Sequence, residues 1–219
     1  MKKKLSLVIY FSFLIIYLEL VYKLFVLNNV FSINSLTIIL FSIPFIMINT
    51  ILCSLFSEKV NRGISIILSL FLTFIFVSQY VYYLFYDSIF SVYSVKEGTG
   101  QVFGEFFNAI VKMVSDNVLS IILLLMPFIL FLIFGKKIFS FNKGKKSLVI
   151  ESISLLVFII VSLITVMFDD KGMYSLKNVY TKTHAPMITI NKVGLLSMEC
   201  LDLERYLFGF EEKLYNVKP

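Results

Sequence analysis

Several residue types are scarce in this chain of 219 residues, and each scarcity excludes a class of protein. With no Trp, one His and two Cys, the chain encodes neither a disulfide framework nor a zinc site of clustered Cys and His. Charged residues make up only 16%, against about a quarter in ordinary soluble domains. P-loop, GxGxxG, GxSxG and HExxH patterns are also missing. We therefore predict no catalytic, cofactor-binding or metal-ligating residue in this chain.

Long apolar runs are what the chain has in abundance, with 58% hydrophobic residues and a mean hydropathy of +0.90. Each run is near the ~20 residues that a helix needs to cross ~30 Å of hydrocarbon. There are five, covering residues 5–27, 36–56, 63–86, 118–134 and 148–168. A backbone in lipid must satisfy its own hydrogen bonds, so each run is predicted to be a helix. We expect an all-α membrane protein with a five-helix transmembrane domain, 1–168, and an extracytoplasmic connector, 169–219.

Charge predicts the orientation of these helices. Loops 1–4, 57–62 and 135–147 together carry a net charge of +9, whereas segments 28–35, 87–117 and 169–219 together carry −2. An excess of Lys and Arg on short loops marks the cytoplasmic side. We therefore predict that the N-terminus is inside and the C-terminal tail outside. A cleaved signal peptide is the alternative for the start, but the first run is longer than about 15 residues and lacks a small-x-small cleavage site.

Two external segments outside the runs carry helical patterns. In the loop after the third run, apolar residues recur at helical spacing over 102–114, which predicts an amphipathic helix on the outer membrane surface; a re-entrant piece is the alternative. In the tail, 171–186 has the residues of an irregular segment and 187–190 those of a short extended piece. From about Leu195 a surface helix is predicted, packing on the external loop helix or on the outer helix ends.

The charged residues inside the first run, Glu19 and Lys23, lie four apart and so on one helix face. We interpret them as a mutually neutralising pair near the outer helix end; contact with a lipid head group or a transported proton is the alternative. In the tail, Asp202 and Arg205 are expected to pair along one helix. His184 is interpreted as an ordinary loop residue, and Cys53 and Cys200 are not expected to form a disulfide.

Two stretches of the tail resemble the connector of lipoteichoic acid synthase-like proteins, which are membrane phosphoglycerol transferases of the sulfatase/alkaline phosphatase superfamily. The first stretch is Asn191-Lys192-Val193-Gly194-Leu195-Leu196. The second is Asp202-Leu203-Glu204-Arg205, followed by Phe208-Gly209-Phe210-Glu211-Glu212. Gly100-Gln101-Val102, after the aromatic third run, and Ser115-Asp116-Asn117, before the fourth, are also similar to that family.

The resemblance implies the anchor of an enzyme of Gram-positive cell-wall biogenesis in the plasma membrane. In that family, an extracytoplasmic domain uses a Thr nucleophile and a divalent metal, often manganese. It transfers glycerol phosphate from phosphatidylglycerol to a glycolipid-linked chain. That domain would follow Pro219, in cis or as a separate partner, so this chain alone is expected to be inactive, as a truncated or split product or a subunit. The implied partners are the bilayer, phosphatidylglycerol or glycolipid, and the sulfatase-type domain, with no nucleic acid.

Two other functions remain open at this point. The first is a non-enzymatic membrane scaffold or a subunit that binds a partner. The second, a small transporter, is weaker because no repeated pair of broken helices occurs and ionisable residues within the runs are few.

Overall fold

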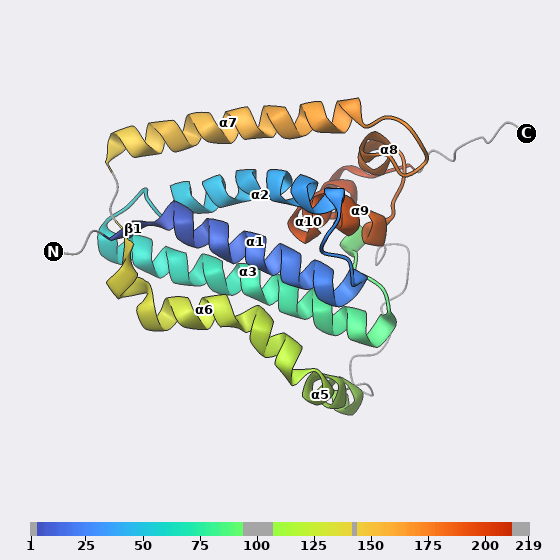
Figure 1. Ribbon diagram of the computed structural model, residues 1–219, viewed down its shortest axis with the longest axis horizontal. Helices are drawn as coiled ribbons and strands as arrows, with labels where there is room; N and C mark the ends of the chain where they lie inside the picture. The colour runs from blue at the N-terminus through green and yellow to red at the C-terminus, as the bar shows by residue number, and fades with distance from the viewer. Residues whose placement is uncertain (1–3, 94–106, 142–143, 212–219) are drawn as a thin grey trace, which may run out of the picture.

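The computed structural model describes residues 4–93, 107–141 and 144–211, which hold nine helices and two very short strands. Five long helices form the body of the molecule: α1 (Leu7–Leu27), α2 (Ile33–Leu52), α3 (Glu58–Tyr86), α6 (Val118–Ile138) and α7 (Lys145–Phe168) (Figure 1). All five are long and apolar enough to cross a membrane. They confirm the five predicted long apolar helices.

The helices extend beyond the apolar runs where charged residues continue the helical backbone. Helix α3 begins at Glu58 rather than at residue 63, and α6 continues to Ile138 rather than ending at residue 134. The last turn of α6 contains Lys136 and Lys137. Cations there interact favourably with the carbonyl end of a helix, so the helix persists past its apolar part.

Successive long helices run in opposite directions, so the connections gather at the two ends of the bundle. One end holds residues 4–6, the α2–α3 turn, the end of α6 and the start of α7; the other holds the α1–α2 loop, helix α5 and the tail helices (Figure 1). The described residues of the three basic segments, which are residue 4, residues 57–62, and residues 135–141 with 144–147, therefore lie at one end of the bundle. At that end, β1 (Leu5–Ser6) pairs in parallel with β2 (Phe139–Ser140).

Helix α1 lies at the centre and packs against α2, α3 and α6. Its fully buried apolar side chains form the middle of the core: Leu7, Phe11, Leu14, Ile15, Leu18 and Tyr22. On α3, a stripe of buried polar residues faces the interior at every fourth position: Asn61, Ser65, Ser69 and Thr73. Each hydroxyl of this stripe donates to the carbonyl four residues earlier, at 2.6–2.8 Å. Small side chains of this kind let membrane helices approach closely.

Helix α7 is the outermost of the five and packs mainly on α2 and on the tail. Its remaining surface exposes apolar side chains along its whole length, including Ile150, Ile153, Leu156, Leu163 and Met167. A continuous apolar surface that runs the whole length of a long helix is normally covered by another protein or by lipid.

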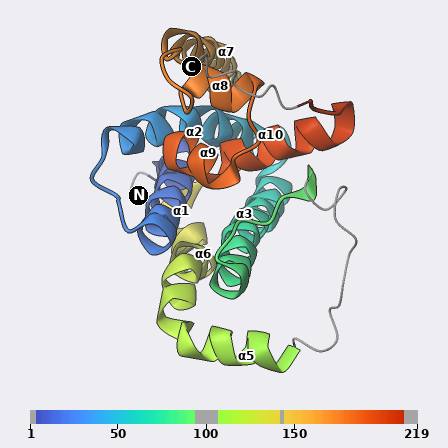
Figure 2. The same cartoon turned by 90° about the vertical axis from the view of Figure 1, so that its right-hand side faces the viewer.

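Helix α5 (Phe107–Asp116) lies in the loop for which the sequence predicts a surface helix over 102–114. Residues 102–106 lie outside the described residues. The helix contacts α3 and α6 at their ends. It runs across the direction of the long helices, as its end-on view in Figure 1 and its lengthwise view in Figure 2 show.

The tail folds into three helices, α8 (Leu176–Thr181), α9 (Pro186–Val193) and α10 (Leu195–Phe208). The helix predicted from Leu195 is confirmed. The irregular segment predicted for 171–186 and the extended piece predicted for 187–190 are wrong, because both contain helix. Pro186 occupies the first turn of α9, where its missing N–H costs nothing, and packing on α2 holds the β-branched residues after it in a helix.

Candidate functional site

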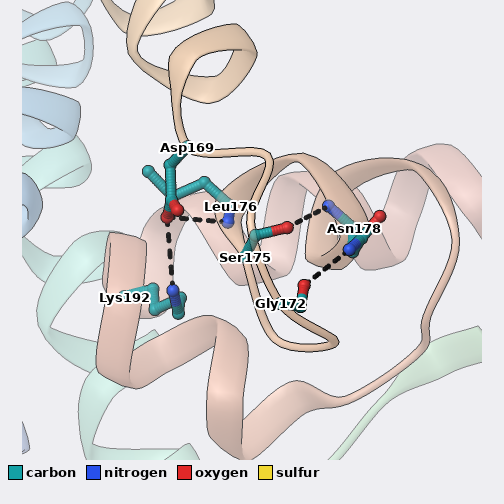
Figure 3. Close-up of polar contacts among 6 residues, drawn as sticks. All are labelled: Asp169, Gly172, Ser175, Leu176, Asn178 and Lys192. Carbon is teal, nitrogen blue, oxygen red and sulfur yellow. Dashed lines mark hydrogen bonds and ion pairs between the residues drawn. The ribbon is translucent and has the colours of Figure 1, made fainter.

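The turn from α7 into the tail is held by one carboxylate and one capping hydroxyl (Figure 3). Asp169 accepts from the backbone N–H of Leu176 at 2.9 Å and forms an ion pair with Lys192 at 3.3 Å. Ser175 accepts from the N–H of Asn178 at 3.3 Å and so caps the start of α8. Asp169 thereby joins the end of α7 to both α8 and α9, which gives the segment after the last membrane helix a defined path.

The centre of the candidate site is a contact between α1 and the joint of α9 and α10. Glu19 accepts from the backbone N–H groups of Leu195 and Leu196, at 2.7 and 2.9 Å. The ammonium group of Lys23 donates to the carbonyl of Asn191 in the last turn of α9, at 3.4 Å. We call this the helix-end contact. Each charge meets the helix end of opposite partial charge: the carboxylate meets an N-terminus and the ammonium a C-terminus.

The helix-end contact lies within the bundle rather than on its surface. Glu19 is 2% exposed and Lys23 is fully buried. Glu19 precedes the last residue of α1 by eight positions, which is about 12 Å along a helix. Lys23 also donates to Ser32 and Ser35 in and after the α1–α2 loop, at 2.9 and 3.1 Å. The tail is therefore inserted between the ends of the long helices.

These partners correct the interpretation of Glu19 and Lys23 as a mutually neutralising pair. The two residues do lie on one face of α1, but each charge is compensated by groups of the tail or the loop. The partners from the tail are far away in the sequence: even the Asn191 carbonyl, which has the smallest separation, comes 168 residues after Lys23. No local spacing rule predicts such a contact.

Gly194 makes the helix-end contact sterically feasible. It ends α9 and begins α10 with φ +90, a conformation that favours glycine. A Cβ atom at this position would lie 2.7 Å from a carboxylate oxygen of Glu19. Because glycine has no side chain to cap α10, the carboxylate of Glu19 supplies the acceptor for the first N–H groups instead.

A second buried contact joins α10 to the segment that follows α3. The carboxylate of Asp202 is 2% exposed and accepts from the Ser91 hydroxyl, from the N–H of Val92 at 2.6 Å and from that of Tyr93 at 3.4 Å. Arg205, on the same helix, donates to the carbonyls of Val179 and Tyr180 at 2.7 and 3.3 Å. The expected pairing of Asp202 with Arg205 along α10 is therefore replaced by bonds to two other segments, the one after α3 and helix α8.

His184 connects these residues and is more than an ordinary loop residue. Its Nδ1 lies 3.2 Å from Arg205 and its Nε2 lies 3.1 Å from the hydroxyl of Ser91. Arg205 can only donate, so Nδ1 is the acceptor and the proton of the neutral ring sits on Nε2. The ring then donates to Ser91, which donates to Asp202. We call Ser91, His184, Asp202 and Arg205 the polar cluster.

The direction of these bonds decides what the polar cluster can do. A nucleophilic serine needs a histidine nitrogen that accepts its proton, with a carboxylate on the other ring nitrogen. Here the ring donates to Ser91, and Arg205 occupies the other nitrogen. Ser, His and Asp side chains are thus brought together without the arrangement for acyl transfer. The polar cluster is suited to hold α10 and residue 184 against the segment after α3.

A third contact places a carboxyl group of α10 against α3. Gln79 donates to the carboxylate of Glu199 and to the carbonyl of Phe90, and it accepts from the Phe90 N–H at 3.1 Å. Burial raises the pKa of Glu199 to about 7; the bond from Gln79 opposes this and the charge of Asp202 adds to it. Docking of α10 is thereby linked to protonation of Glu199.

Docking of the tail is expected to weaken as the pH rises from about 5 to about 8. The pKa of Glu199 is 4.5 when the residue is free and about 7 in the folded chain, so the docked form binds the proton more tightly. This stabilisation is complete below pH 4.5 and is lost as the pH rises through about 7. Hydrogen exchange of the α10 amides, corrected for the intrinsic pH dependence of exchange, measures it. In Glu199→Gln the change should be much smaller; an equal change in both proteins would assign the effect to another group.

The two cysteines lie in different parts of the described structure, and no disulfide joins them. Cys53 is buried at the end of α2, and Cys200 is exposed on α10.

Comparison with family models, with curated proteins and with solved structures found no match for this chain.

The candidate site is defined by three contacts through which the tail binds the bundle. These are the helix-end contact, the polar cluster and the Gln79–Glu199 contact.

Proposed function

We propose that this chain is the membrane-anchoring part of a lipoteichoic acid synthase-like glycerol-phosphate transferase, and that it holds an extracytoplasmic catalytic domain in a fixed position above the membrane. The observation that carries the proposal is the helix-end contact, in which buried charges of α1 bind both helices of the tail. A flexible tether would need no such contact. A connector that sets the height and tilt of a following domain does need one.

The residues on which the family resemblance rests support the proposal, because they are the residues that hold the tail. Asn191 and Gly194 belong to the first stretch and take part in the helix-end contact. Asp202 and Arg205 belong to the second stretch and form part of the polar cluster. The guanidinium of Arg205 also lies over the ring of Phe210, 4.2 Å from its centre. The resemblance is thus concentrated where the tail meets the bundle.

The distribution of charge supports an orientation with the tail outside the cell. The end of the bundle that holds the described residues of the basic segments, including Lys4, Lys136 and Lys146, would face the cytoplasm, and the end with the tail would face the exterior. Lipid substrates such as phosphatidylglycerol or a glycolipid would then reach the catalytic domain by diffusion in the outer leaflet of the plasma membrane. Helix α5, which lies across the bundle, would rest on that surface.

The proposal gives no residue of this chain a catalytic role. Within residues 4–93, 107–141 and 144–211, no three His, Cys, Asp or Glu side chains lie close enough together to hold a metal ion. These residues do not fit the manganese that the resemblance implies, so the metal and the nucleophile would belong to the catalytic domain, in cis or in trans.

The proposal is tested by attaching the soluble catalytic domain of a lipoteichoic acid synthase after Pro219 and reconstituting the fusion in vesicles that contain fluorescent phosphatidylglycerol. The fusion is expected to turn over this lipid about tenfold faster than the same fusion carrying Gly194→Ala, since misplacement of a reacting group by about 1 Å can cost 100-fold. Both proteins stay in the membrane, so the comparison isolates positioning from anchoring.

Two further results bear on the same proposal. The 219-residue chain without the domain is expected to leave fluorescent phosphatidylglycerol unchanged. Alkaline phosphatase fused after Pro219 is expected to be active in cells, whereas a fluorophore that matures only in the cytosol is expected to stay dark. Equal turnover by the two fusions, or an inactive phosphatase, would contradict the proposal.

A further inference from the structure

Helix α10 crosses the bundle below the ends of the long helices. Its first turn is bound by Glu19, eight positions before the last residue of α1, and its second turn by Gln79, seven positions before the last residue of α3. At 1.5 Å per residue, these positions lie about 12 and about 10 Å inside the two helix ends. Figure 2 shows α10 lengthwise at this end of the bundle, so α10 runs across the long helices at a nearly constant level.

The ends of α1 and α3 mark the boundary of the hydrocarbon layer. Helix α1 has 21 residues, about 30 Å, so nearly all of its length is needed to cross about 30 Å of hydrocarbon. The last five residues of α3 include Tyr82, Tyr83 and Tyr86, and tyrosine gathers where a membrane meets water. Since α10 is bound about 10 Å inside both ends, it lies at the level of lipid rather than of water.

The side chains of α10 are distributed in reverse of those of a helix at a water surface. Asp202 and Arg205 are buried, whereas four large apolar side chains are 40–82% exposed. A helix next to water turns its charged side outward. In a membrane, ionisable side chains face the interior of the bundle and apolar side chains face lipid. The four exposed apolar residues are Leu203, Tyr206, Leu207 and Phe208.

Glu204 limits how deep α10 lies, because it is the one charged side chain among the exposed residues of this helix. The cost of a charge on a lipid-facing surface falls steeply from the centre of a bilayer to its boundary. A helix that lies in the membrane plane at this boundary buries its apolar side about 5–10 Å into the region where head groups meet acyl chains. This depth agrees with the level set by Glu19 and Gln79.

We propose that α10 lies within the lipid leaflet at the tail end of the bundle, parallel to the membrane plane, with its exposed apolar side against acyl chains near the head groups. The partner of this side of α10 is therefore the lipid leaflet, and its contact adds to the three protein contacts that hold the tail. The inference depends on membrane insertion of the long helices. It depends neither on the proposed function nor on which side of the membrane the tail occupies.

The level of α10 is measured with an environment-sensitive fluorophore attached to a single cysteine of the full chain in phosphatidylcholine nanodiscs. Leu207→Cys carries the fluorophore in a Cys200→Ser background, where the remaining Cys53 is buried. The nanodiscs contain lipids with a nitroxide on the acyl chain, either close to the head group or close to the chain end, and iodide quenches from water. The Leu207→Cys fluorophore is expected to be quenched more by the shallow nitroxide than by the deep one, with loss of most iodide quenching.

Two further labelled positions calibrate the measurement. Leu156→Cys, on the exposed side of α7 near its middle, is expected to be quenched most by the deep nitroxide, and Lys171→Cys, in the turn after α7, by iodide. Iodide quenching at Leu207→Cys as strong as at Lys171→Cys would place this side of α10 in water and overturn the proposal. Protection from iodide and from both nitroxides would also overturn it, because a second protein chain would then cover α10. All three replaced side chains are exposed, so the fluorophore displaces no packed residue.

Discussion

Gly194→Ala is expected to release α9 and α10 from the bundle while leaving the five long helices folded. A residue with a side chain is strained by about 1–3 kcal/mol at φ +90. The new Cβ would also lie 2.7 Å from the carboxylate of Glu19, so that side chain must move away from the two N–H groups that it binds. Loss of bonds to a charged acceptor adds about 1.5–3 kcal/mol. A combined change of about 3 kcal/mol or more shifts the docking equilibrium more than 100-fold.

Hydrogen exchange of the α10 amides measures this release directly. In the unmodified chain, the N–H groups of Leu195 and Leu196 are bound to Glu19 and should exchange slowly; in Gly194→Ala they should exchange at least 100-fold faster. Gly209→Ala is the matched control. Gly209 also has a positive φ, of 78, but a Cβ there would meet no atom within 4 Å. If both variants were equally protected, steric access to Glu19 would not be what Gly194 provides.

Glu19→Lys is expected to prevent docking of the tail even more completely. The substituted ammonium would face the N-terminus of α10, which already carries a partial positive charge, and it would lie one helical turn from Lys23. Removing one partner of a buried charge contact costs about 3–5 kcal/mol. Glu19→Gln should have a smaller effect, because its carbonyl oxygen can still accept from one of the two N–H groups.

Limited proteolysis in vesicles distinguishes these outcomes. The tail of Glu19→Lys should be cut fastest, that of Glu19→Gln at an intermediate rate and that of the unmodified chain slowest. Glu58→Lys is the matched charge reversal, because Glu58 is exposed at the start of α3 and far from the tail in the fold. Cleavage of Glu19→Lys and Glu58→Lys at the same rate would show that the carboxylate of Glu19 does not hold α10.

Two of the three tail contacts use residues that the sequence already marks, but with different partners. Glu19 and Lys23 are conspicuous because charges are rare in apolar runs, and their shared face is correctly predicted from their spacing. Asp202 and Arg205 likewise stand out on a predicted helix. In each case the oppositely charged residue three or four positions away on the same helix is not the partner in the structure. A buried charge binds whichever backbone groups reach it, and these come from segments 100 or more residues away for Glu19 and Asp202.

Local sequence alone determined the five long helices and their alternating directions. An apolar run in lipid has one way to satisfy its backbone, so its length and composition are sufficient to predict a helix. Because successive helices alternate in direction, every second connection lies at the same end of the bundle, and the basic loops are every second connection. These features need no knowledge of which helix contacts which.

Only the tertiary structure decided the form of the tail and the positions of its functional residues. Short segments such as 176–181 and 186–193 gain little from intrinsic helix propensity and become helical because α2, α7 and one another cover them. The role of Gly194 depends on a carboxylate from α1, which lies 175 residues earlier in the chain. Contacts between distant segments depend on how the long helices pack, and the apolar pattern within each helix does not specify that packing.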